Sequence, residues 1–438
     1  MDNSIPKMMD NRQKLRVLGF FLALCLPWSG GAQQPCPIDS LWAMVDRDFP
    51  TKHQMGLNLE NGDLVQKALN TNWYPKVGAE GSATYQSEVT SFSLPGLPAG
   101  SVPVPAKDQY KIGLVLSQTL FDAGMTRAKK QLERLNTLAK SHAYQAELLN
   151  VKGTVLDLAT SIMIAKNSVR QLEHSWENLQ NRAKNVELAI ANGEALAVEG
   201  EEIEVAILEM ERQIQGTLSQ IQTAYGTLQV LTGMATGDRP DFTFPQMEEG
   251  HGGDFGLRPE VQALDNELLG LEWQKKELDR KALPRLSLFL DGYYGRPGFN
   301  FLDNDFRVYG IGGVELSFPI TSLGYNRSLK KGLAIQRESV VLEKRKLTDQ
   351  LTIQEIQLSK ALETVQVYLE EDVRIVALRQ KILGTAQIQF DNGSLLFSEY
   401  LEKLHNYQNA KIDLRIHELQ ESQLRYRQRL LFNTNTNP

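Results

Sequence analysis

The sequence predicts an α+β chain built from two tandem copies of one unit: a short helix, a β-hairpin and a very long helical hairpin. An internal repeat and two long breaker-free helical stretches lead to this fold class. At one offset of 200 residues, Gly124-x-x-Arg127 recurs as Gly324-x-x-Arg327, and Asn192-Gly193 recurs as Asn392-Gly393. A repeat that keeps its register across glycines and segment boundaries indicates a duplicated supersecondary unit.

The N-terminus has the layout of a secretory signal peptide. Arg16 precedes an apolar stretch over residues 17–26, and small residues follow up to Ala32. We therefore predict a signal peptide over residues 1–32 and an N-terminal extension over 33–49. The apolar stretch is shorter than the ~20 residues of a membrane-spanning helix, and we expect no such window later in the chain.

Composition narrows the function classes. The formal net charge is −6, which argues against a nucleic-acid partner. Cys25 lies inside the signal peptide, so Cys36 has no cysteine partner in the exported chain. An unpaired cysteine cannot form an intrachain disulfide, and stability must come from packing.

Two stretches without proline, residues 126–191 and 326–391, predict long helices. At ~1.5 Å per residue, each helix would be a rod of roughly 100 Å. In the second stretch, apolar residues recur in steps of three, four or seven, which is coiled-coil spacing. These residues are Leu329, Leu333, Val340, Leu347, Leu351, Leu358, Leu362, Val365, Leu369, Val373 and Val376.

Each rod ends at an Asn-Gly pair, which suits the left-handed geometry of a helix end, and a second helix returns. The first repeat then covers residues 50–232, with a β-hairpin at about 76–118 and a helical hairpin at about 123–232. The second repeat covers 259–433, with corresponding hairpins at about 285–318 and 323–433. A linker over 233–258 joins the repeats, and the short helices continue the pairing beyond the returning ones.

The four strands alternate apolar and polar residues with period two, so each strand has one apolar face and one polar face. A soluble sheet packed on a helix shows the same alternation. However, strands of about 10 residues can cross an outer membrane, and the strand-to-rod junctions at residues 120–122 and 320–322 leave almost no loop. Four strands also leave two unpaired edges, which lipid does not tolerate, so a membrane sheet must close with copies of itself.

These features together resemble a known family. "Leu-x-Ser-Gln-Thr-Leu-Phe-Asp-Ala-Gly" at 116–124 and "Leu-Ser-Phe-Pro-Ile-Thr-Ser-Leu-Gly" at 316–324, with the tandem units and Asn-Gly turns, resemble the TolC-like outer-membrane efflux proteins. The resemblance implies a homotrimer with four strands per protomer, a 12-stranded transmembrane β-barrel in outer-membrane lipid, and a periplasmic α-barrel of helical hairpins. It further implies a periplasmic adaptor and an inner-membrane pump or ABC transporter as partners.

The resemblance also implies candidate site residues at the helical tips. In the family, acidic residues shortly after the second tip gate the periplasmic entrance, and the matching positions are Glu399 and Glu402, with Glu199 and Glu202 in the first repeat. Acids in the first turns of a helix also complement its dipole without any gating role. The expected adaptor-docking tips are Asn192, Gly193, Asn392, Gly393, Leu395 and Leu396.

We find no catalytic constellation in the sequence, and we expect no metal and no cofactor. The six histidines are dispersed and form no i, i+4 pair, and Cys36 has no partner. The expected function is an outer-membrane exit duct. The alternative is a periplasmic coiled-coil adaptor or scaffold, which would explain the rods but not two amphipathic hairpins fused to them.

Overall fold

The computed structural model describes residues 35–90, 95, 96, 98, 103–193, 196–235, 237, 239–245, 253–320 and 322–432. The predicted signal peptide, residues 1–32, lies outside the described residues. The first unit contains α3 (Pro50–Asn70), η1 (Thr71–Trp73), β2 (Lys76–Tyr85), β3 (Asp108–Phe121), α4 (Met125–Ala191) and α5 (Ala197–Thr232). The second contains α6 (Pro259–Lys281), β5 (Arg285–Arg296), β6 (Arg307–Ser317), α7 (Ser322–Asp391) and α8 (Phe397–Leu431).

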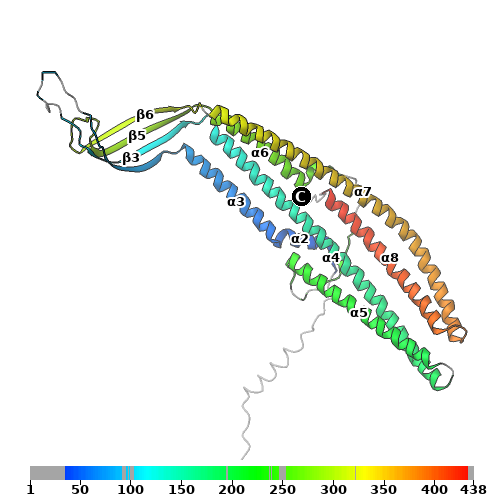
Figure 1. Ribbon diagram of the computed structural model, residues 1–438. Helices are drawn as coiled ribbons and strands as arrows, with labels where there is room; N and C mark the ends of the chain where they lie inside the picture. The colour runs from blue at the N-terminus through cyan, green and yellow to red at the C-terminus, as the bar shows by residue number, and fades with distance from the viewer. Residues whose placement is uncertain are drawn as a thin grey trace, which may run out of the picture.

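The helices form one elongated body (Figure 1). α4 packs against α3 and α5 on one side and against α6 and α8 on the other, while α7 packs against α6 and α8. α3 and α5 cover successive lengths of α4, and α6 and α8 cover successive lengths of α7. α4 has 67 residues and α7 has 70, so each is about 100 Å long. The order across the body is therefore α3/α5, α4, α6/α8 and α7.

The predicted coiled-coil seam of α7 is present, with two exceptions. Leu333, Val340, Leu351 and Val365 are buried in it. Leu329 and Val373 are 37% and 59% exposed, so assigning them to the seam was wrong. The seam instead passes through Asp372, whose carboxylate contacts His417 of α8 at 2.5 Å.

One 18-residue window of α4 is apolar enough to cross a membrane, judged by length and composition alone. The expectation that no such window follows the signal peptide was therefore wrong. The physical reason is burial between helices, because α4 packs against α3 and α5 on one side and against α6 and α8 on the other. It supplies Leu148, Val155, Leu156 and Ile162 to the largest hydrophobic core.

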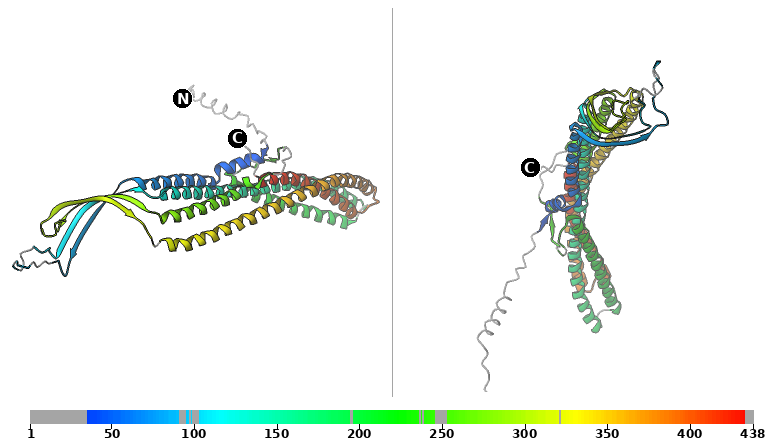
Figure 2. Two further views of the ribbon diagram at one scale, coloured as in Figure 1. Left: turned by 90° about the horizontal axis from the view of Figure 1, so that it is seen from above. Right: turned by 90° about the vertical axis from the view of Figure 1, so that its left-hand side faces the viewer.

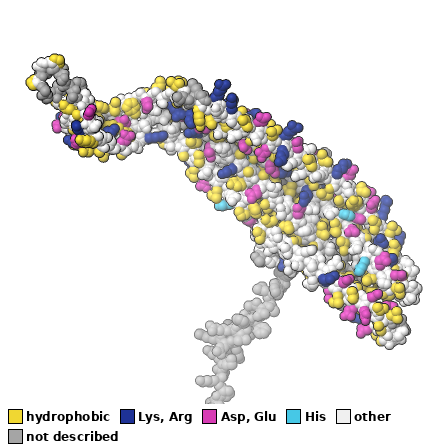
Figure 3. All heavy atoms as spheres, viewed as in Figure 1, with side chains coloured by type: hydrophobic (Ala, Val, Ile, Leu, Met, Phe, Trp, Pro, Cys, Tyr) yellow, Lys and Arg dark blue, Asp and Glu magenta, His cyan; other side chains and the backbone are white. Residues whose placement is uncertain are grey.

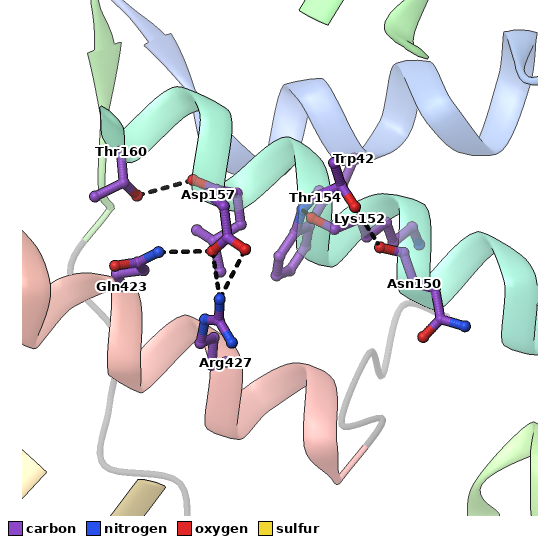
Figure 4. Close-up of polar contacts among 9 residues, drawn as sticks. Trp42, Asn150, Lys152, Thr154, Asp157, Thr160, Gln423 and Arg427 are labelled. Atoms are coloured by element: carbon purple, nitrogen blue, oxygen red, sulfur yellow. Dashed lines mark hydrogen bonds and ion pairs between the residues drawn. The ribbon is translucent and has the colours of Figure 1, made fainter. Parts of the chain in front are cut away.

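A belt crosses the middle of the body, formed by β1 (Cys36–Pro37), α2 (Ile38–Asp48) and β4 (Phe242–Thr243). β1 pairs with β4, and Trp42 of α2 donates from Nε1 to the carbonyl of Lys152, at 3.0 Å (Figure 4). The Lys152 ammonium, whose side chain is only 6% exposed, pairs with Asp46 at 2.7 Å. On the other side of α4, Asp157 accepts from Arg427 and Gln423 of α8 (Figure 4). The belt and these pairs hold the two units together.

α6 begins where α8 ends, and Arg258 spans the joint. Arg258 precedes Pro259 and is 8% exposed. Its Nη1 donates to the carbonyls of Leu430 and Leu431, at 3.1 and 2.9 Å, so it satisfies two of the carbonyls that a helix end leaves without a partner. Its Nε and Nη2 donate to Glu260. A single buried guanidinium therefore ties the end of one helix to the start of the next.

The four long strands form one antiparallel sheet in the order β2-β3-β5-β6, which extends beyond one end of the helical body (Figures 1 and 2). One of its faces is apolar and lies open. The exposed fractions of Val77, Ile112, Leu290 and Val308 on this face are 68%, 65%, 59% and 82%. Figure 3 shows apolar side chains along this arm, whereas charges of both signs are interspersed on the helical body.

The turn from β3 to α4 takes three residues, Asp122 to Gly124. Gly124 has φ of +79°, in the left-handed region that glycine tolerates. The Asp122 carboxylate accepts from the backbone N–H groups of Gly124 and Thr126, at 2.8 and 2.7 Å. Arg280 of α6 donates to the carbonyl of Ala123. Sheet and rod are thus joined rigidly, and the second unit braces the junction of the first.

Candidate functional site: the tips of the helical hairpins

Both helical hairpins turn on a glycine at the end of the body farthest from the sheet. Gly193 and Gly393 have φ of +77° and +69°. A methyl group at either glycine would meet no atom within 4 Å, so backbone conformation rather than space requires glycine here. The preceding Asn192 and Asn392 still donate their backbone N–H groups to the helix, at 3.1 Å each. The Asn-Gly pairs therefore act as helix ends, as the sequence pattern indicates.

An apolar core lies directly behind the two turns and joins the hairpins. α8 contributes Phe397, Tyr400 and Leu404, which are 1%, 4% and 5% exposed. They belong to one cluster with residues of α4, α5 and α7: Leu172, Leu179, Val186, Ile203, Ala206, Met210 and Ala386. The tips of the two hairpins are thus packed on each other within one chain.

One charged side chain lies in the seam of α4, the row of residues that faces this apolar core. Arg182 follows Leu172, Ser175 and Leu179 on α4 at alternating steps of three and four, so it occupies a seam position. Its side chain is 13% exposed. A cation at a seam position requires a specific partner, because an unpaired buried charge is costly.

The partners of Arg182 all come from the other hairpin. Its guanidinium carbon lies 3.9 Å from the ring centroid of Tyr400 and 5.1 Å from that of Phe390, and its Nη1 lies 3.6 Å from Asp391. A partly desolvated cation–π contact contributes about 1–2 kcal/mol. An ion pair with the mostly exposed Asp391 adds less. We call Arg182, Phe390, Asp391 and Tyr400 the inter-hairpin latch.

Beside the latch, a cleft of about 630 Å³ opens between the two tips. It is lined by polar and apolar groups from α4, α5, α7 and the second turn. These are Arg182, Asn185, Val186, Ala189, Glu199, Phe390, Asp391, Gly393, Ser394, Leu395 and Leu396. Three of the six predicted docking residues, Gly393, Leu395 and Leu396, thus line one cleft, and Leu396 is 61% exposed.

The four predicted acids take different places. Glu199 is half-buried and lines the cleft, whereas Glu202, Glu399 and Glu402 are exposed. Glu402 accepts from Lys403 at 3.0 Å, and this hydrogen bond and charge, with Asn406 and Arg379 adding to them, hold its pKa below the usual range. The structure therefore brings Glu199 to the cleft and leaves Glu399 exposed on α8, outside the cleft lining.

Sequence reasoning missed the latch. Arg182 could have been found from its position, because it breaks the apolar spacing of the α4 seam with a charge. Its pairing with Tyr400 could not, because that contact depends on how the two hairpins pack. Among the described residues, no group of three or more His, Cys, Asp or Glu gathers in the way a metal site requires.

Comparison with known proteins shows what the chain is similar to. Residues 65–234 match the family described as outer membrane efflux protein. No curated protein matches the chain by sequence.

The structural similarity extends over most of the chain. The structures of CusC, described in connection with transmembrane channel formation, and of the outer-membrane channel OprN each superpose with a TM-score of 0.72. They are 16% and 14% identical, and cover 90% and 92% of this chain and 91% of their own. The Campylobacter jejuni outer membrane channel CmeC gives a TM-score of 0.70 at 14% identity, over 90% of this chain and 85% of its own.

The family match falls on the first unit, and the shared fold extends over both units and the tips. The family and the matched structures are channels rather than enzymes. Residues 65–234 therefore match the outer membrane efflux protein family, and the chain as a whole has the fold of solved outer-membrane channels such as OprN and CmeC.

Proposed function

We propose that the protein is the outer-membrane exit duct of a tripartite efflux or type I secretion system. In this proposal it receives substrates from a periplasmic adaptor and an inner-membrane pump or ABC transporter, and releases them outside. The observation that carries the proposal is the sheet: it has one exposed apolar face, one polar face and two unpaired edges, and it continues directly into the helical body.

The two faces of the sheet differ sharply. The polar face carries charged residues in successive rows across the sheet, and the strand registers place all of them on this one face: Glu315, Lys76, Asp291, Glu80 and Lys111. An apolar face suits lipid, and a charged face suits a water-filled lumen. The free edges of β2 and β6 would be costly in lipid, since each exposes unpaired backbone groups. Three copies would satisfy them in a closed 12-stranded barrel.

The helical body also has two apolar edges, one on each side. α7 forms one edge, and away from its buried seam it exposes a second row of apolar residues. α3 and α5 form the other edge and expose Leu57, Leu64, Val205 and Leu208, all between 53% and 58%. Two different apolar edges on one subunit suit a head-to-tail ring, which closes when the rotation between copies is complete. This supports a homotrimer with a helical tunnel below the barrel.

The tips are the proposed periplasmic entrance and adaptor-docking region. Asn192, Gly193, Asn392, Gly393, Leu395 and Leu396 would contact the adaptor. Three copies of Glu399 and Glu402, with Glu199 and Glu202, would place carboxylates around the entrance and favour cations there. The inter-hairpin latch holds the tips together within each subunit, so opening would require Arg182 to leave Tyr400.

Planar-bilayer recording tests both the duct and its gate. The purified wild-type protein should form discrete channels, which a coiled-coil scaffold would not. The double variant Glu399→Ala with Glu402→Ala should raise the single-channel conductance and weaken block by divalent cations, because it removes carboxylates from the entrance. Glu418→Ala is the matched control, since Glu418 is an exposed acid on the same helix, at ~1.5 Å per residue about 24 Å from Glu402.

Absence of channels would reject the duct. Channels whose conductance and divalent block are unchanged in the double variant would keep the duct and remove Glu399 and Glu402 from the gate.

A further inference from the structure

The polar face of the sheet carries an aromatic group toward its outer end. The strand registers align Glu80 of β2, Gly113 of β3, Tyr293 of β5 and Tyr309 of β6 in one row across all four strands. The Tyr293 and Tyr309 rings lie with centroids 5.7 Å apart, and Phe299 packs edge-on against Tyr309 at 4.9 Å. Aromatic rings are not what a water-filled pore interior requires, since such interiors are polar.

The ring of Tyr293 is held in a fixed place. A methyl group at Gly113 would lie 2.4 Å from its Cδ1, so only glycine leaves room for the ring against β3. The Tyr293 hydroxyl donates to Oε2 of Glu80 at 3.3 Å, across Gly113. The ring therefore lies along the wall beside a carboxylate.

Packing on glycine is not by itself a sign of binding. Phe289 covers Gly313 on the same face in the same manner, and such pairs stabilise sheets. Charge distinguishes the Tyr293 position. Glu80 lies in its row, and Asp291 lies two residues before it on the same face. Tyrosine rings flanked by carboxylates attract cations, because the ring face is negative.

The chain already places a cation there. The Lys111 ammonium lies 4.8 Å from the centroid of the Tyr293 ring. Lysine is a flexible chain that can swing away from the ring. This contact shows that a cation fits over the Tyr293 ring. The Lys111 ammonium that now lies there can be displaced.

We propose that Tyr293 and Tyr309, with Glu80 and Asp291, form a binding subsite for organic cations with an aromatic group, on the wall of the exit lumen. The proposal rests on the proposed function, because the polar face becomes a lumen wall only in the closed barrel. Three copies would surround the exit path at one level, where a passing cation would bind transiently.

The opposite face provides a matched control. Tyr294 points to the apolar face, where it stacks on Phe306 at 5.6 Å, and Tyr110 stacks on the same ring at 6.4 Å. Aromatic residues at this level of an outward face are typical of the membrane–water boundary. In the proposed barrel, Tyr294 thus faces lipid and the adjacent Tyr293 faces the lumen. The same substitution can therefore be compared on the two sides of one strand.

The test is block of single-channel current by benzyltrimethylammonium, added on the side of the loops that follow β2 and β5. Tyr293→Ala and Tyr309→Ala should each weaken block by about two- to fivefold, the size of one exposed cation–π contact. Tyr293→Phe should retain block, because it keeps the ring. Lys111→Met should strengthen block by removing the competing ammonium, and Tyr294→Ala should leave it unchanged.

Benzenesulfonate, which has the same ring and the opposite charge, should not block the wild type. Equal block by both ions, or equal losses in the Tyr293→Ala and Tyr294→Ala variants, would overturn the subsite while the channels themselves persist. Failure to observe any channels would instead count against the proposed function.

Discussion

At the scale of single residues, Asp122 stabilises the junction between strand β3 and helix α4. Its side chain is buried, with 3% of the residue exposed, and burial opposes its ionisation. Hydrogen bonds from Thr126, Gly124 and Met125 outweigh that burial and set the pKa of the carboxyl below its ordinary value. A carboxylate with a depressed pKa stabilises the fold above the pKa of the unfolded chain, and this contribution is lost as pH falls through the folded pKa.

We therefore expect Asp122→Ala to lower the free energy of unfolding at pH 7 by about 1–2 kcal/mol, the upper part of the range for a lost helix cap. The deficit should begin to shrink as pH falls below ~4, where aspartate in the unfolded chain is protonated, and should be lost once pH has fallen through the lower pKa of Asp122 in the folded protein. Thermal unfolding in detergent at both pH values measures this. Asp349→Ala, an exposed change on α7, should have little effect at either pH. A deficit that is the same at pH 7 and in acid would contradict the carboxylate's role.

At the scale of elements, hydrophobic periodicity and turn residues predict the helix seam and the turns, whereas the contacts between elements depend on how those elements pack. The α7 seam and the Asn-Gly turns follow from local sequence. α3 continues through Gly56 and Gly62, and Gly62 packs closely against Thr137. The Arg182 contact with Tyr400 and the Tyr293 ring on Gly113 depend on how hairpins and strands from different units are paired. No periodicity encodes that pairing, so neither contact could be read from the sequence.

The joint between α8 and α6 gives a prediction at this scale. Arg258→Ala would leave two helix-end carbonyls and Glu260 without their donor in a buried place, and such a loss costs about 1–3 kcal/mol. Amide hydrogen exchange should quicken in the last turn of α8 and the first turn of α6, and not at the tips. Arg415→Ala removes an exposed pair with Glu418 on α8 and should cost at most ~0.5 kcal/mol. Equal exchange in the two variants would show that Arg258 does not secure the joint.

At the scale of the whole molecule, apolar surface lies where one subunit cannot cover it. Along the outer edge of α7, exposed apolar residues form two series spaced by 11 or 22 residues, and multiples of 11 keep one side of a nearly straight helix apolar. They are Leu342, Ile353 and Ile375, and Ile356, Val367 and Leu378. Exposure of these two apolar rows to water is unfavourable, so a neighbouring subunit is the natural partner of this edge of α7.

This edge sets the assembly prediction. The double variant Val367→Glu with Leu378→Glu should prevent ring closure, because two charges per interface would be buried against the apolar edge of the next subunit. Both residues are exposed in the single chain, at 52% and 60%, so the fold of each subunit should persist, and its far-UV circular dichroism should be unchanged. Sizing in detergent should then give about three times the mass of the 49.3 kDa chain, less its signal peptide, for the wild type and a monomer for the variant.

The control is Gln366→Glu, which adds a charge at the exposed position beside Val367. Because Gln366 lies about 100° around the helix from Val367, this change should leave the trimer intact. A double variant that still migrates as a trimer would place the subunit contact on a different surface, and the apolar rows of α7 would then require another explanation.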